Sequence, residues 1–150
     1  MKKIIFLLPI FLLLFIACKS DDDATTTKGA SVVKATIDGV EKTFNTINVV
    51  RSSMHSSETY LVTASINNNP NETFKFNIYA ENPSNSHDFL YSIDYFKNNT
   101  TYSVRNQNDG NLIVTHFGDR AYKGNFSVNL FGGNNMQQVK ITNASFEIYY

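Results

Sequence analysis

Cys18 is the only cysteine in the 150-residue chain, and its side chain is the one best suited to covalent chemistry. A thiolate is a strong nucleophile and can take up a lipid in thioether linkage. A single thiol excludes a disulfide framework and a cysteine-based zinc site. Because an unpaired thiol is a liability in an oxidising compartment, the residues around Cys18 have to explain it.

The residues before Cys18 have the layout of a signal peptide. Lys2 and Lys3 form a short basic region, and residues 4–16 follow as an apolar run without a charge. This run is too short for a transmembrane helix, which needs about 20 residues, and Pro9 interrupts it. Residues 1–17 are therefore predicted to be a signal peptide that is removed.

The sequence around the cut, Phe-Ile-Ala-Cys at residues 15–18, resembles the lipobox of bacterial lipoproteins. The resemblance implies that Cys18 receives a diacylglyceryl group, that a peptidase cuts before it, and that the new amino group is acylated. Ile16 is bulkier than the residue usual at its position. The resemblance also implies a membrane as partner, to which the protein is attached through this N-terminal lipid. The alternative is a secreted protein with one unpaired thiol.

An acidic cluster follows at once, in the order Lys19, Ser20, Asp21, Asp22, Asp23. It resembles the surface-export signal of Bacteroidota lipoproteins, which implies an outer-membrane lipoprotein that faces the cell exterior. A solvated tether is the alternative, because residues 21–30 are polar and poor in apolar side chains. Both can hold, since an export signal has to be accessible. Residues 18–30 are predicted to be a lipidated, disordered tether.

The charge balance argues against nucleic acid as a partner. The chain has 13 basic and 13 acidic residues, and removal of residues 1–17 leaves 11 basic against 13 acidic, a net charge near −2. Nucleic-acid binding would need a basic stripe or face. The chain also lacks a phosphate loop, a dinucleotide fingerprint and a nucleophile elbow, so no cofactor is expected.

The candidates for acid–base chemistry are three histidines and three aspartates: His55, His87, His116, Asp88, Asp94 and Asp119. The histidines lack the short spacings of common metal sites. Two carboxylates about 5–9.5 Å apart could hydrolyse a glycoside, but the sequence shows no such distance. His116 shares a strand face with Leu112 and Val114, so we expect a partly buried structural residue. Catalysis is therefore not expected.

Tyrosine is the one suggestive excess, at Tyr60, Tyr79, Tyr91, Tyr95, Tyr102, Tyr122, Tyr149 and Tyr150. Tyrosines on a sheet face can stack on sugars or anchor a protein partner. Tyrosine is also simply favoured in strands. The absence of Trp lowers the expectation of carbohydrate binding without removing it.

Residues 31–150 alternate apolar and polar side chains with period two and are predicted to form a single all-β domain, an antiparallel β-sandwich or small barrel. Residues 74, 76 and 78 should face inward, as should 124, 126, 128 and 130. Asp38-Gly39 predicts a two-residue hairpin turn, with a return strand over residues 40–50 anchored by Phe44. A parity change near Asn143 predicts a bulge. Residues 86–99 fit either a helical turn or a strand with a loop.

Four elements of this domain resemble a family of small Bacteroidota lipoproteins of unknown function. They are "VKATIDGVEKTF", "NNTTYSV", "YKGNFSVNLF" and "VKITNASFEI", and together they extend over about residues 32–148. Asn125 stands where the family has Thr, and the last element lacks its Gly. Membership implies an all-β domain on a lipid tether and supplies no activity.

The sequence thus predicts a cell-surface lipoprotein whose β domain binds an extracellular protein or glycan ligand without catalysis. A carbohydrate-binding accessory module and a small hydrolase are the alternatives. An exposed row of tyrosines would favour the first of these, and a converging pair of carboxylates or a His–acid pair would favour the second.

Overall fold

The computed structural model describes residues 29–54, 57–133 and 137–150. The predicted signal peptide, Cys18 and the acidic cluster at residues 19–23 lie outside the described residues, as does His55. In the described part of the chain, no helix is both long enough and apolar enough to cross a bilayer.

The described chain is almost entirely β-strand, which confirms the predicted all-β class. One short helix, α1 (Ser86–Tyr91), and a 3-10 turn at Gln107–Asp109 are the helical elements of the described residues. The strands are β1 (Val32–Ile37), β2 (Val40–Phe44), β3 (Thr46–Met54), β4 (Ser57–Ile66), β5 (Asn69–Tyr79), β6 (Asp94–Lys97), β7 (Thr100–Ser103), β8 (Gly110–Gly118), β9 (Ala121–Gly132) and β10 (Gln137–Tyr149).

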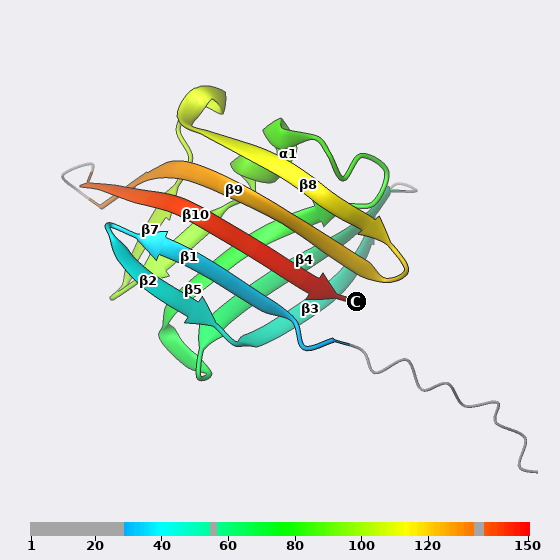
Figure 1. Ribbon diagram of the computed structural model, residues 1–150. Coiled ribbons are helices and arrows are strands. Elements are labelled where there is room, and N and C mark those ends of the chain that lie inside the picture. The colour runs from blue at the N-terminus through cyan, green and yellow to red at the C-terminus, as the bar shows by residue number, and fades with distance from the viewer. Residues whose placement is uncertain (1–28, 55–56, 134–136) are drawn as a thin grey trace, which may run out of the picture.

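All the strands belong to one antiparallel sheet that curls into a nearly closed barrel. Its order is β2-β1-β10-β9-β7-β6-β5-β4-β3, and β8 pairs with β9 beside β7. Figure 1 shows β1, β2, β9 and β10 crossing in front of β3, β4 and β5. The sheet edges β2 and β3 are consecutive in the chain and are joined by Asn45 alone.

Asn45 is where the structure departs from the predicted return strand. The chain turns there from one edge of the sheet to the other, so residues 40–50 form parts of two strands. The Asn45 Nδ2 donates to Asn67 Oδ1 at 2.7 Å, and Asn67 N donates back to Asn45 Oδ1 at 2.8 Å. These bonds hold the corner against the β4–β5 turn. Phe44 is fully buried, as predicted for the anchor of this segment.

Two local predictions about backbone geometry are confirmed. Asp38 and Gly39 link β1 to β2 with φ of +49° and +83°, as a type I′ turn requires. Asn143, with φ of +49°, marks a register shift of β10 against β9 between Ile141 and Ala144. The bulge returns the apolar side chains of β10 to the interior.

Aromatic side chains fill the interior of the barrel. The predicted inward faces of β5 and β9 are buried. Phe126 lies between the rings of Phe74, Phe89 and Phe146, with centroid distances of 6.2, 5.6 and 6.2 Å. Edge-to-face and tilted contacts of this kind add to the free energy of burial. The barrel is therefore packed rather than hollow.

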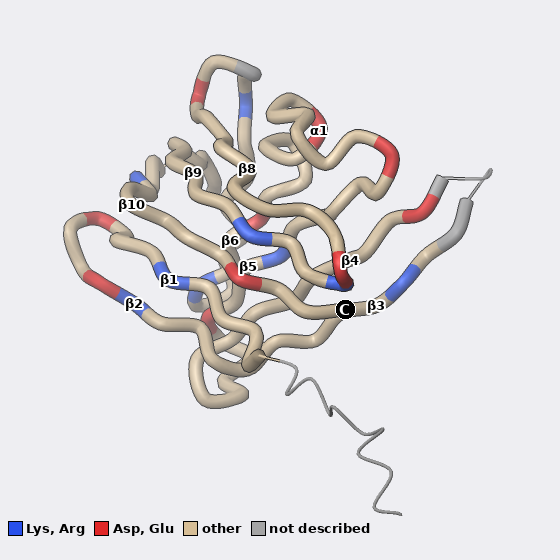
Figure 2. Tube along the Cα trace, turned by 45° about the vertical axis from the view of Figure 1, so that its right-hand side comes forward, with Lys and Arg blue, Asp and Glu red and all other residues tan. Residues whose placement is uncertain are grey.

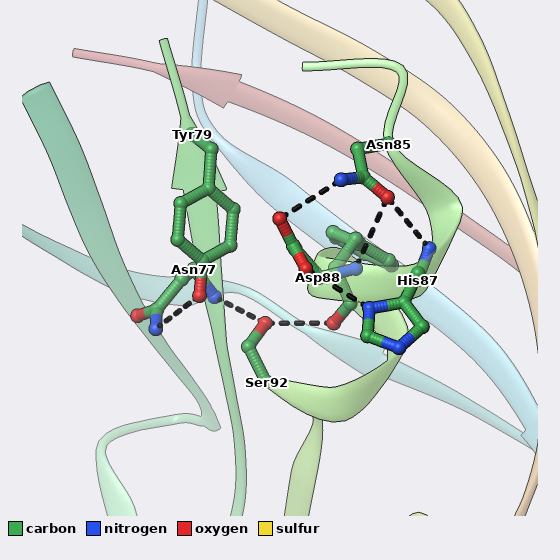
Figure 3. A network of polar contacts seen from close by, with 7 residues as sticks. Asn77, Tyr79, Asn85, His87, Asp88 and Ser92 are labelled. Carbon is green, nitrogen blue, oxygen red and sulfur yellow. Dashed lines mark hydrogen bonds and ion pairs between the residues drawn. The ribbon is translucent and has the colours of Figure 1, made fainter. Parts of the chain in front are cut away.

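The helix α1 lies against β8 and β5. Residues 86–99 were predicted to form either a helical turn or a strand with a loop, and they contain both a helix and a strand. Residues 86–91 are helical and β6 follows at Asp94. Asn85 Oδ1 caps the helix by accepting from the backbone N–H groups of His87 and Asp88, at 3.0 and 3.3 Å (Figure 3). Phe89 and Leu90 are buried and carry the helix into the core.

Candidate functional site

The predicted acid–base candidates on α1 serve the cap of the helix. His87 Nδ1 lies 3.0 Å from Asp88 Oδ1, but both side chains are about half exposed. The other Asp88 oxygen accepts from Asn85 Nδ2 at 2.8 Å. The nearby Ser92 hydroxyl donates to the Phe89 carbonyl at 2.7 Å and accepts from Asn77 N at 2.8 Å (Figure 3). This network holds the helix and β5 together. The Ser92 hydroxyl donates its one hydrogen within the network, so it is not available as a nucleophile.

The remaining candidates lie on separate elements. Asp94 on β6 accepts from Ser103 Oγ at 2.6 Å, and Asp119 occupies the β8–β9 turn with φ of +48°. The expectation for His116 was wrong: it is exposed, because the register of β8 shifts between Val114 and His116. No hydrogen bond or ion pair among the described residues joins Asp94, His116 and Asp119.

The described residues also contain no group of three or more His, Cys, Asp or Glu side chains placed to hold a metal ion.

The tyrosines do not form an exposed row; several gather at the two ends of the barrel. Tyr95, Tyr102 and Tyr122 are buried, and Tyr91 is the most exposed, at 45%. Tyr95 and Tyr102 lie at the end that holds the Asp38 turn, with Val139 of β10. Tyr60, Tyr149 and Tyr150 lie at the opposite end. We call these the Asp38 end and the Tyr150 end.

A depression of about 530 Å³ lies at the Tyr150 end, where β1 begins, β10 finishes and the β8–β9 turn meets β3 and β4. Figure 1 shows the start of β1 beside the C-terminus at this side of the barrel. We call this depression the tyrosine–arginine pocket. It is lined by Ser31, Ile47, Val49, Arg51, Tyr60, Arg120, Tyr149 and Tyr150.

Two stacked tyrosines and the backbone shape this pocket. The ring centroids of Tyr60 and Tyr150 are 4.1 Å apart, and the angle between the ring planes is 38°. Tyr150 N donates to the Arg120 carbonyl at 3.0 Å, and Tyr149 N donates to Ser31 Oγ at 2.9 Å. Tyr60 lies on β4, paired with β3 on one side and β5 on the other, so both tyrosines of the stack are positioned by the backbone before any ligand arrives.

Glu58 organises the β3–β4 side of the pocket. The Tyr60 hydroxyl donates to Glu58 Oε1 at 2.5 Å, and Arg51 Nε pairs with the same oxygen. The hydrogen bond to this carboxylate raises the pKa of Tyr60 to about 12, so the phenol stays protonated at neutral pH. Burial raises the pKa of Tyr150 as well. The pocket thus has neutral tyrosine walls.

Two arginines give the pocket a positive rim. Arg51 keeps the N–H donors on its terminal nitrogens although Nε is paired. Arg120 has no ion-pair partner within the described part of the chain. Figure 2 shows basic segments on both sides of the C-terminus, one of them on β3.

The Asp38 end has a depression of about 580 Å³ that is lined by one acid, Asp38, and one base, Lys97, and a cluster of paired groups lies beside it. Glu72 accepts from Lys42 Nζ and from the Tyr95 hydroxyl, and we call these three residues the Glu72 cluster. Burial opposes the charge of Glu72, but the bonds from Lys42 and Tyr95 outweigh it and lower its pKa. The Tyr102 hydroxyl donates to Gln137 Oε1 at 3.2 Å.

Residues of the pocket other than the tyrosines were not found as candidates from the sequence. Arg51, Glu58 and Arg120 lie on elements that meet only when the sheet closes. Their sequence neighbourhood shows nothing beyond a charged strand and a Gly-Asp turn. The excess of tyrosine was the one usable signal, and it indicated binding without indicating where.

No family model, curated protein or solved structure matches the chain. The fold is a nearly closed antiparallel barrel with a packed aromatic core.

Proposed function

We propose that the protein is a lipoprotein of the outer-membrane surface whose β domain binds a ligand and does not catalyse a reaction. The observation that carries the binding half is the tyrosine–arginine pocket. It combines an apolar floor, aromatic walls and a few polar groups in a preformed concave site, which is the common composition of ligand pockets.

The absence of an assembled nucleophile favours binding over hydrolysis. The raised pKa values of Tyr60 and Tyr150 keep both phenols neutral, and the serine of the pocket, Ser31, has no histidine among the lining residues to activate it. The candidate acids and histidines of the described residues are not among the lining residues: they lie at the cap of α1, between β6 and β7, and at the β8–β9 turn. A carbohydrate-binding accessory module is the second candidate, favoured by the Tyr60–Tyr150 stack.

The anchoring half of the proposal rests on Cys18 and on the acidic cluster, with the likeness to small Bacteroidota lipoproteins as its context. Cys18→Ser should leave an uncleaved, unacylated precursor, because serine lacks the nucleophilic thiolate. Intact-mass measurement of the purified wild type should show a chain that begins at an acylated Cys18. A mature chain that begins elsewhere would refute the anchor.

Protease treatment of intact cells tests the location. Wild type should be digested, and replacement of Asp21, Asp22 and Asp23 by alanine should protect the protein while it stays lipidated. Replacement of Thr25, Thr26 and Thr27 by alanine is the matched control and should remain digestible. A wild type that resists the protease until the outer membrane is opened would place the protein in the periplasm.

A further inference from the structure

We propose that the tyrosine–arginine pocket binds a saccharide that carries a carboxylate or a phosphate. This inference rests on the proposed binding function and specifies its ligand. Four properties of the pocket support it: its depth, its aromatic walls, the direction of its hydrogen-bonding groups and its charge.

The pocket is a depression at the barrel rim and does not lead into the interior. The side chains beneath it belong to a filled core, in which Phe76, Phe126 and Ile148 are buried to within a few per cent of their surface. A long acyl chain or another extended apolar ligand would need a hollow barrel. A compact polar ligand of one to a few rings suits a depression of about 530 Å³.

The walls present flat apolar surface to such a ring. Tyr60 and Tyr150 are half-buried, so part of each ring remains open to the pocket that it lines. Ile47 and Val49 supply the floor and pack against the core. Tyrosine rings on this kind of surface can stack on the apolar face of a sugar ring.

Most of the side-chain hydrogen-bonding groups that remain available are donors, and the Tyr150 hydroxyl can donate as well as accept. The Tyr60 hydroxyl is committed to Glu58, and the Tyr149 hydroxyl is committed to Glu147 and also accepts from Lys123 Nζ at 3.2 Å. Ser31 Oγ accepts from Tyr149 N and keeps its O–H to donate. The guanidinium groups can only donate. A ligand rich in acceptors is therefore favoured.

The charge of the pocket selects an anion among such ligands. Arg51 and Arg120 line it; Arg51 is paired with Glu58, so the net positive charge comes from Arg120, which has no ion-pair partner among the described residues. Guanidinium groups bind carboxylates and phosphates in bidentate geometry. The depression at the Asp38 end has a similar volume, but Asp38 and Lys97 both line it and their charges offset each other, so an anion should prefer the Tyr150 end.

Calorimetric titration of the full-length protein in a non-ionic detergent tests this inference. The probes are tetragalacturonate, galactose 1-phosphate and neutral galactotetraose. At least one anionic probe should bind and the neutral probe should bind at least about tenfold more weakly, because the arginine contacts are charge-assisted. The two anionic probes distinguish a carboxylate from a phosphate ligand. Added salt should weaken binding.

Matched arginine variants locate the site. Arg120→Gln and Arg51→Gln should each lower the affinity for the anionic probe by about tenfold or more. Arg105→Gln is the control, because the Arg105 guanidinium lies over Phe131, 5.4 Å from the ring centroid and away from the pocket. It should bind as wild type does.

Two kinds of result would overturn the inference. Equal binding of the neutral tetramer, no binding of either anionic probe, or wild-type affinity in both pocket variants would show that the pocket does not take an acidic saccharide. Each of these would leave the proposed non-catalytic function standing. Cleavage of a probe, detected by chromatography of the reaction mixture, would instead refute the proposed function.

Discussion

The two ends of the barrel use similar residues in opposite ways. At the Asp38 end, Glu72 is surrounded by the donors that it needs, and its cluster ties β2, β5 and β6 together. At the Tyr150 end, the Tyr60 hydroxyl is bound to Glu58, but Arg120 has no ion-pair partner within the described residues. Paired polar groups stabilise a fold, whereas preformed donors without partners are available to a ligand. The difference separates a structural end from a binding end.

The largest effect should come from the core that both ends share. Phe126→Asp would place an unpaired charge among Phe74, Phe89 and Phe146, at a cost of more than about 4 kcal/mol. We expect loss of the β-type circular dichroism spectrum and of the thermal transition. Ile113→Asp is the control, because Ile113 lies on β8 with 60% of its surface exposed. It should change stability by about 0.5 kcal/mol or less.

Glu72→Gln should produce the next largest effect and sharpen the comparison. It removes the charge that Lys42 faces and weakens the acceptor for the Tyr95 hydroxyl, and we expect a loss of about 1–3 kcal/mol in the free energy of unfolding. Chemical denaturation measures this loss. Binding of the anionic probe should be unchanged, because the pocket is at the other end. A parallel loss of affinity would mean that the two ends are not independent.

The pH dependence of stability should report the same cluster. Because the folded state lowers the pKa of Glu72 below its ordinary value of 4.5, the unfolded state binds the proton more tightly. The contribution of Glu72 is therefore complete above about pH 4.5 and is lost as the pH falls through the lowered pKa. The stability difference between wild type and Glu72→Gln should shrink over that acidic range. A stability difference that persists at acidic pH would mean that packing, and not the charge of Glu72, causes it.

Tyr60→Phe should have the smallest effect on stability. It removes only the hydroxyl that donates to Glu58 on a half-exposed surface and keeps the ring stacked on Tyr150. We expect a loss of about 0.5–1.5 kcal/mol, nearer the lower bound. Thermal melts beside Glu72→Gln test the ranking. A larger loss for Tyr60→Phe than for Glu72→Gln would reverse the assignment of the structural end.

The strands could be predicted from the sequence because their alternation is local. The inward faces around Phe76 and Phe126, the Asp38-Gly39 turn and the bulge at Asn143 all follow from side-chain periodicity and backbone preference. The corner at Asn45 could not be predicted, because residues on both of its sides are good strand formers. Only closure of the sheet decides that one edge ends there and the other begins.

The pocket was harder to predict for the same reason. Arg51 and Arg120 approach one opening because β3 and the β8–β9 turn meet at the Tyr150 end, which no local pattern encodes. His116 shows that a prediction from local alternation can also be wrong. Its strand face was predicted from alternation alone, and a single shift of register on β8 exposes it.

Gly29 lies where the described chain enters the domain, beside the pocket. A Cβ atom at this position would lie 2.5 Å from the Tyr149 ring, so the chain enters the domain pressed against the side chain that borders the pocket. If Cys18 is the lipid anchor, as we propose, the roughly ten residues between it and Gly29 can span at most about 40 Å at full extension. On that proposal the tether joins the domain at the Tyr150 end, and the Asp38 and Asn98 turns lie at the other end of the barrel. If the tether keeps the Tyr150 end near the bilayer, ligands held at the membrane would meet the pocket at a raised local concentration.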